Sequence, residues 1–293
     1  MTTILQLLIY GVQLGSIYAL IALGYTMVYG IIRLINFAHG DFLMLGAFVG
    51  FFAVSYFNLG FIPVMLLSMV VIGMVGVAVE RIAYKPLRSK PRLSSLITAI
   101  GVSIFLQNFP RALPAIGPAP RPFPRLIPLV NYEFLGVTIS SIQIVMILLS
   151  FTLMLLLHLL TTKTAIGRRM KAVSFDKDAA ALMGINVNNT ISITFFIGAA
   201  LAAAGGILYA TTYPMIDVYM GSVLGTKAFT AAVLGGIGII PGAMLGGVIM
   251  GVAEVLATSI NSDLGYGIGF VILILILLFK PAGLLGKYTI EKV

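Results

Sequence analysis

Long apolar runs occupy most of this sequence, and their length constrains the fold more than any other feature. A helix that crosses a lipid bilayer needs about 20 mostly apolar residues. Nine segments approach that length: 4–30, 36–57, 61–80, 94–110, 139–161, 186–211, 222–239, 242–260 and 264–279. The segment 222–239 is short and rich in glycine, so it either crosses the bilayer or re-enters it. The sequence therefore predicts an all-α polytopic membrane protein with eight or nine transmembrane helices, one of them a candidate re-entrant segment.

The composition agrees with a chain whose solvent is lipid. Charged residues make up 9% of the 293 residues and hydrophobic residues 60%, whereas a soluble domain carries about 25% charge. The net charge of +9 comes from residues spread between apolar runs, so nucleic acid is not indicated as a partner. The chain has no cysteine, which excludes a disulfide framework and a thiolate metal site. We interpret residues 1–293 as one transmembrane domain, whose first span begins at the N-terminus without a removed signal segment.

The Lys and Arg residues predict the orientation, because cationic loops stay in the cytoplasm. Fourteen of the 18 fall on one side of the predicted topology: Arg33, Arg81, Lys85, Arg88, Lys90, Arg92, Lys163, Arg168, Arg169, Lys171, Lys177, Lys280, Lys287 and Lys292. The other side keeps Arg111, Arg121, Arg125 and Lys227. We therefore expect the segment 167–187 and the C-terminus to be cytoplasmic. With nine spans the N-terminus is external.

A proline-rich stretch, 110–128, falls on the external side. It holds seven of the 13 prolines, so it cannot form a regular helix. It is either a rigid connector or part of a docking surface for an external partner.

Motifs for catalysis are missing from the sequence. It contains no P-loop to hold a nucleotide phosphate, no HExxH metalloprotease motif and no GxSxG nucleophile elbow. The two histidines, His39 and His158, are far apart in sequence. An enzyme and a metal site are therefore poorly supported.

A first group of polar residues lies near the start of the second apolar run. Asn36, His39 and Asp41 surround Gly40. Ionisable groups at membrane depth indicate a transport pathway or an ion pair, and His39 and Asp41 are candidates to pair with one another. The alternative is that this segment is the hydrated end of a span.

A second group lies within 234–256. Gly235 and Gly236 precede Pro241 and Gly242, and Glu254 follows. Small residues at helical spacing let helices pack closely, which is the alternative to a pathway role for the glycines. A lone carboxylate such as Glu254 needs a partner or water inside a membrane. Because interrupted apolar segments in both halves of a chain point to the site in repeat-built transporters, the candidate pathway residues are Asn36, His39, Gly40, Asp41, Gly235, Gly236, Pro241, Gly242 and Glu254.

The stretch "GRRMKAVSFDKDAAALMGINV", 167–187, predicts a short helix in water. Asp176 is a helix cap, Asp178 lies in the first turn where negative charge is favoured, and Gly184 is a natural stop. A helix of about two turns is not stable alone. It must lie on lipid or insert into a cytoplasmic partner.

This stretch also resembles a known motif. "DAAALMG" is similar to the EAA---G coupling motif of ABC importer permeases, with Asp178 in place of Glu, followed by Ala179, Ala180 and Gly184. In that family the helix seats in a cleft of the ATPase and transmits its closure. The resemblance implies a coupling helix near 176–184, and we count Gly167 and Arg168 with the same surface.

Three further segments narrow the resemblance. Residues 15–48, 228–256 and 277–286 look like the LivH-type branched-chain amino acid permease. The family implies the architecture of an ABC importer permease in a bacterial inner membrane. It also implies a second LivM-like permease, two ABC ATPase subunits and a periplasmic substrate-binding protein as partners. ATP and Mg²⁺ then belong to the ATPase subunits, and this chain binds no cofactor itself.

The expected function is inward transport of Leu, Ile and Val, driven by ATP hydrolysed in the partner subunits. Urea, short amides or other amino acids are alternative substrates. A channel or secondary transporter working alone is a further alternative, although such a protein has no need of a cytoplasmic coupling helix. A membrane scaffold is disfavoured by Asp41 and Glu254.

Overall fold

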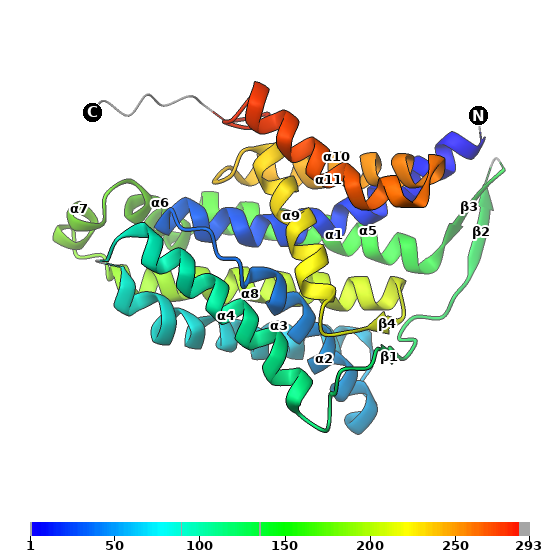
Figure 1. Ribbon diagram of the computed structural model, residues 1–293, viewed down its shortest axis with the longest axis horizontal. Coiled ribbons are helices and arrows are strands. Elements are labelled where there is room, and N and C mark those ends of the chain that lie inside the picture. The colour runs from blue at the N-terminus through cyan, green and yellow to red at the C-terminus, as the bar shows by residue number, and fades with distance from the viewer. Residues whose placement is uncertain (1, 89, 135, 287–293) are drawn as a thin grey trace.

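The computed structural model describes residues 2–88, 90–134 and 136–286, and helices dominate it (Figure 1). The helices are α1 Thr2–Ile32, α2 His39–Phe57, α3 Phe61–Val79, α4 Arg92–Ala112, α5 Ser141–Lys163, α6 Ala165–Phe175, α7 Lys177–Leu182, α8 Val187–Thr212, α9 Met220–Gly235, α10 Ile240–Ile260 and α11 Ser262–Phe279. The helix α3 continues through a π-helical turn, η1 (Glu80–Tyr84), and a 3₁₀ turn, η2 (Lys85–Leu87). The tail lysines Lys287 and Lys292 lie outside the described residues.

Eight of the described helices are long and apolar enough to cross a membrane, which confirms the prediction of an all-α polytopic protein. The remaining predicted span, 222–239, corresponds to α9, which has only 16 residues. At 1.5 Å per residue it is about 24 Å long, shorter than the hydrocarbon core of about 30 Å.

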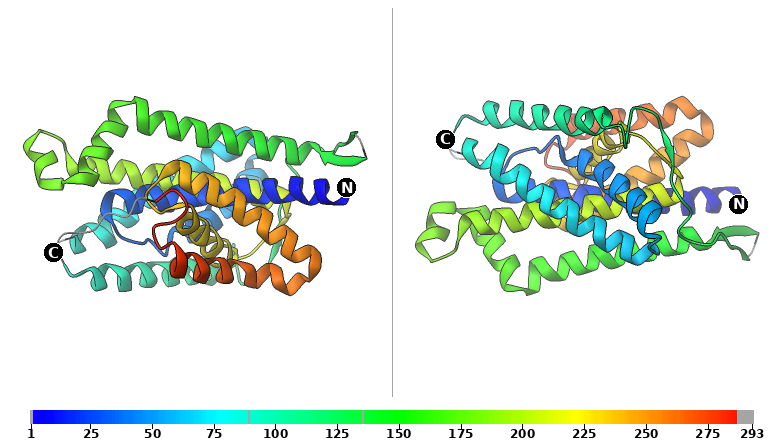
Figure 2. Two further views of the ribbon diagram at one scale, coloured as in Figure 1. Left: turned by 90° about the horizontal axis from the view of Figure 1, so that it is seen from above. Right: turned by 90° about the horizontal axis from the view of Figure 1, so that it is seen from below.

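The whole segment between α8 and α10 nevertheless leads back from the N-terminal end of the molecule, although α9 itself lies steeply across the long axis (Figure 1). The helix α8 runs toward the end of the molecule that holds the N-terminus, and α10 runs back toward that same end (Figure 1). The loop after α9 reaches the end of α1, where Gly30 faces Gly238. The N-terminus therefore lies at one end of the long axis, while α6, α7 and the end of the described chain lie at the other. In the views of Figure 2, α7 projects farthest at that second end.

Local signals in the sequence set several helix ends. Ser140 and Gln143 form a capping box at the start of α5, where the Ser140 hydroxyl accepts from the Gln143 backbone N–H at 3.2 Å and the Gln143 side chain accepts from the Ser140 N–H at 2.8 Å. The helix α9 ends at Gly236, whose φ of 108° is unfavourable for a residue with a side chain.

The strands within the described residues are two short antiparallel pairs. β1 (Arg121–Pro122) pairs with β4 (Met215–Ile216), and β2 (Asn131–Phe134) forms a hairpin with β3 (Val137–Ser140). The first three residues of the proline-rich stretch, 110–112, end the helix α4, contrary to the prediction, because Pro110 is accommodated in its last turn. The rest of the stretch is non-helical as predicted, and β1 ties it to the segment between α8 and α9.

The core centres on α1 and α8, which are the most buried of the candidate spans. The helix α1 packs against α10 at backbone distance through small residues. A methyl group added to Gly15 would lie 2.7 Å from the Cα atom of Val248. Gly247 and Gly251 face α1 in the same way. The small-residue spacing predicted from the sequence therefore serves close helix packing.

Candidate translocation cavity and partner-facing helix

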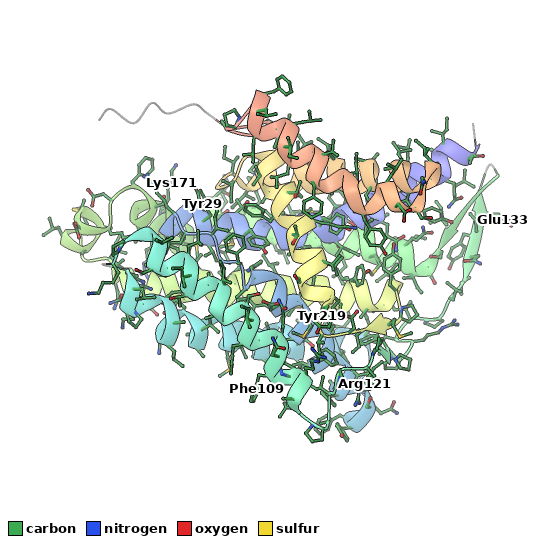
Figure 3. All side chains as sticks on the ribbon, viewed as in Figure 1. Tyr29, Phe109, Arg121, Glu133, Lys171 and Tyr219 are labelled. Carbon is green, nitrogen blue, oxygen red and sulfur yellow. The ribbon has the colours of Figure 1, made fainter. Side chains whose placement is uncertain are left out.

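A cavity of about 530 Å³ lies between α1, α8, α9, α10 and α11, at the end of the molecule that holds the N-terminus. Tyrosines and charged groups converge on it from all of these elements. Its polar lining includes Tyr18, Tyr209, Tyr213, Tyr219, Tyr266, Asp217, Lys227 and Glu254. We call it the tyrosine cavity. Figure 3 shows Tyr219 near the start of α9. Along the long axis of the molecule it lies between Glu133, on the hairpin at one end, and Lys171, on α6 toward the other end.

An ion pair crosses the wall of the tyrosine cavity. The ammonium of Lys227 lies 2.5 Å from Oε1 of Glu254, and the hydroxyl of Tyr18 donates to Oε2 at 2.9 Å. The side chains of Lys227 and Glu254 are 13% and 12% exposed. The sequence required a partner or water for Glu254, and Lys227 and Tyr18 are its partners. The sequence placed Lys227 on the external side of the topology but did not connect it with Glu254. The pairing follows from α9 and α10 packing side by side, because a carboxylate at membrane depth needs a compensating charge.

Small residues bring the remaining walls close to this pair. A methyl group on Gly265 would overlap the hydroxyl of Thr258, so the two helices α10 and α11 lie close together at this glycine. This approach places the Lys227 ammonium 5.3 Å from the centre of the Tyr266 ring, within the range of a cation–π interaction. Asp217, in the turn before α9, accepts from the Tyr219 N–H at 2.7 Å. The tyrosine cavity thus holds both signs of charge among aromatic walls.

The first predicted polar group is buried elsewhere. Asn36 accepts from the Tyr84 hydroxyl at 2.6 Å, and Asp41 accepts from the Gln107 side chain at 2.9 Å. These contacts tie the start of α2 to η1 and α4. Neither residue lines the tyrosine cavity.

His39 does not pair with Asp41, which was one of the alternatives that the sequence left open. Residues two apart on a helix do not face each other. The His39 ring instead packs against Tyr25, with centroids 4.6 Å apart, and against Phe42. Its two nitrogens make no hydrogen bond with the described residues. The neighbouring Gly40 lets α2 touch α9, since a methyl group there would lie 2.8 Å from the Cα atom of Gly225.

The glycines of the second predicted group pack helices rather than line the tyrosine cavity. Gly235 and Gly242 meet backbone to backbone, and Gly236 lies against Gly286 of the C-terminal segment. Pro241 lines a second cavity of about 280 Å³ at the α7 end, together with His158 and other residues. We call this second space the inner cavity. Of the predicted pathway residues, only Glu254 reaches the tyrosine cavity and only Pro241 the inner one.

The short helix α7 has the local structure that the sequence predicted. The Asp176 carboxylate accepts from the N–H groups of Asp178 and Ala179, at 2.8 and 3.0 Å. Gly184 follows the helix with φ of +78°, the left-handed stop.

The faces of α7 and α6 differ from the expectation. Ala180 is 4% exposed and Gly167 is buried against Thr161, so both contact this chain itself. Ala180 and Gly167 therefore position α7 and α6 within this chain and are not themselves available to a partner. Arg168, Asp178 and Ala179 are exposed. The most exposed apolar side chains here are Phe175, Leu182 and Met183, at 78%, 90% and 82%. The candidate contact residues from the sequence did not include these three, although apolar residues in a charged loop were the available signal.

Known proteins resemble this chain along nearly all of its length. The family model described as branched-chain amino acid transport system / permease component matches residues 7–277. The high-affinity branched-chain amino acid transport system permease protein BraD of Pseudomonas aeruginosa is 45% identical, covering 99% of this chain and 98% of that protein. The corresponding protein LivH of Escherichia coli is 42% identical, covering 99% and 97%. A shorter match of 39% identity, covering 28% of this chain and 24% of the other, links it to the autoinducer 2 import system permease protein LsrC of Klebsiella pneumoniae.

Proposed function

The chain belongs to the family of permease components of branched-chain amino acid transport systems, and from this premise we propose that it moves Leu, Ile and Val across a bacterial inner membrane into the cytoplasm. It does so as the membrane-spanning subunit of an ABC importer. The observation that carries the substrate class is the Lys227–Glu254 pair in the tyrosine cavity.

The charges of the tyrosine cavity suit an amino acid zwitterion. The substrate carboxylate can take the place of Glu254 beside Lys227, and the substrate ammonium can take the place of Lys227 beside Glu254. Exchange of this kind keeps every buried charge paired, which avoids the high cost of an unpaired ion in a poorly hydrated space. A neutral substrate such as urea offers no such exchange, so the pair favours amino acids over the urea alternative.

The apolar part of the lining suits a branched side chain. Leu14, Met220, Val223 and Leu224 face the same space as the tyrosine rings. Such walls discriminate weakly between similar apolar side chains, since one methylene is worth about 1–3 kcal/mol. Fine selectivity among Leu, Ile and Val therefore belongs largely to the external binding protein.

Close packing between the two cavities supports alternating access. The tyrosine cavity lies toward the N-terminal end and the inner cavity toward the α7 end. Between them, Gly247 and Ala19 bring α10 and α1 to backbone contact. A substrate can pass this point only if the helices move apart, so the energy must come from outside the chain.

The exposed face of α7 is where a partner subunit can act mechanically on these helices. Phe175, Leu182 and Met183 expose apolar side chains in a segment that the Lys and Arg distribution places in the cytoplasm. An ATPase subunit that covers this face can push on α7 and, through Ala180 and α6, on the spans. In this proposal ATP and Mg²⁺ are bound by two ATPase subunits, the chain itself has no catalytic site, and a second LivM-like permease and a periplasmic binding protein complete the importer. The C-terminus is cytoplasmic.

The test is leucine uptake by cells that carry a change at Glu254. Glu254→Gln removes the charge but keeps the shape, and it should reduce the initial rate of uptake strongly. Asp263→Asn is the matched control, because Asp263 is an exposed acid on α11 that does not line the tyrosine cavity. Both proteins should be present in the membrane at wild-type amounts. Equal uptake by wild-type and Glu254→Gln cells would remove the pair from the substrate pathway.

A further inference from the structure

Four cationic residues line a small cavity at the α7 end of the molecule. Arg33 comes from the loop after α1, Arg88 and Lys90 from the loop before α4, and Lys177 from the first position of α7. The cavity has a volume of about 220 Å³ and is completed by Ile32, Leu34 and Ser95. We call it the cationic pocket.

The cationic pocket has a firmly held side. Arg88 forms an ion pair with Glu80, which is fully buried in η1, and donates to the Asn188 side chain at 2.7 Å. Glu80 in turn accepts from the Ser192 hydroxyl at 2.7 Å. These contacts hold the Arg88 guanidinium against α8. The negative charge of Glu80 is compensated by Arg88.

The other side of the pocket is crowded with positive charge. Burial, and then the nearby Arg88 and Arg33, lower the pKa of Lys177, while Asp178 acts in the opposite direction. Lys90 and Lys177 are both exposed. Among the described residues, no acid belongs to the lining of the pocket. An anion in the pocket would reduce the repulsion between Lys177 and its cationic neighbours.

We propose that the cationic pocket binds the phosphate of an anionic phospholipid from the cytoplasmic leaflet. Arg and Lys together suit a phosphate group, which accepts several charge-assisted hydrogen bonds at once. Basic pockets between transmembrane helices on the cytoplasmic side are the places where lipid head groups bind. This pocket lies where α1 ends and α4 begins, which is the level of the head groups if the charged loops are cytoplasmic.

The surroundings of the pocket favour a lipid over a free phosphate ion. Ile82 of η1 and Leu93 and Ile97 of α4 are 79%, 65% and 60% exposed, on the two elements that flank the loop of Arg88 and Lys90. Apolar side chains this exposed in a membrane protein need acyl chains as neighbours. One phospholipid molecule can contact both, with its phosphate in the cationic pocket and its acyl chains against these apolar side chains.

A bound phosphate would also connect α7 to the body of the permease. Lys177 is the first residue of α7, and Lys90 belongs to the loop before α4. The lipid would hold these two segments together. The site does not depend on which protein covers the exposed face of α7.

The experiment measures lipid binding to the full chain, purified together with the subunits that accompany it. Native mass spectrometry would compare retention of phosphatidylglycerol and phosphatidylcholine by the wild type and by Lys90→Gln/Lys177→Gln. Both side chains are exposed, so the double variant should fold normally. The control variant is Lys163→Gln/Arg169→Gln, which removes two exposed cytoplasmic charges outside the pocket.

We expect phosphatidylglycerol to bind the wild type and the control alike. It should bind the pocket variant roughly 30-fold more weakly, since each of the two basic residues removed contributes about 1 kcal/mol near a lipid surface. Inorganic phosphate in excess should not displace the lipid. Equal retention by all three proteins would overturn the site. Displacement of the lipid by inorganic phosphate would overturn the assignment of a lipid as its occupant.

Discussion

The exposed face of α7 allows the sharpest prediction about partner binding. Leu182 and Met183 are 90% and 82% exposed, so neither side chain contributes much to the stability of this chain. If a cytoplasmic ATPase subunit covers them, the full hydrophobic contribution of both side chains appears in the binding free energy. Burial of a Leu or Met side chain is worth about 1.5–3 kcal/mol. Leu182→Ala and Met183→Ala should each weaken the complex by about 2 kcal/mol, which is roughly 30-fold in affinity.

The assay is co-purification of the ATPase subunits with the tagged permease, followed by a titration of the separated partners in detergent. Unfolding of the permease itself should occur at the same temperature in all variants. Ile260→Ala is the control, because Ile260 is 81% exposed but lies at the end of α10 away from α7. The control should retain the ATPase subunits fully. If Leu182→Ala/Met183→Ala also retains them at wild-type affinity, α7 rests on lipid or in water and the proposed route for energy is wrong.

Three other predictions concern topology and packing. Cysteines introduced one at a time at Lys163 and Asn131 of this cysteine-free chain should differ in intact cells, with an impermeant reagent labelling only Asn131→Cys; the reverse pattern would invert the orientation. Gly247→Leu should lower stability by about 1–3 kcal/mol, because α1 leaves no room for a side chain, and an unchanged thermal unfolding temperature would contradict the packing. Ala180→Glu should loosen α7 from the chain, because Ala180 is 4% exposed and a buried unpaired carboxylate is costly; faster proteolysis within 176–184 checks this, and wild-type resistance would oppose it.

Local features of this protein follow from its sequence. The Asp176 cap and the Gly184 stop of α7 depend on neighbouring backbone groups only, and both are confirmed. The long spans follow from the length of the apolar runs in the same way. For the short segment 222–239 the sequence left open whether it crosses the bilayer or re-enters it, and its helix α9 has 16 residues.

Contacts between distant segments were not predictable. Lys227 and Glu254 are 27 positions apart and pair only because α9 and α10 lie side by side. The sequence alone required a partner or water for Glu254 but did not identify Lys227 as that partner. Gly235 and Gly242 looked like pathway residues and instead pack against each other, since a glycine pattern gives the same signal for both roles. Likewise the side of α7 that faces inward depends on how α6 and α8 pack against it, which put Ala180 inside and Leu182 outside.

The most direct test of inward, ATP-driven amino acid transport uses proteoliposomes that contain this chain with its partner permease and ATPase subunits. The vesicles hold ATP and Mg²⁺ on the side of α7, and labelled leucine with its binding protein is added on the other side. We predict accumulation of leucine that requires ATP, is blocked by unlabelled isoleucine or valine, is unaffected by urea, and is lost in Glu254→Gln. Accumulation without ATP, or competition by urea in place of the amino acids, would contradict this function.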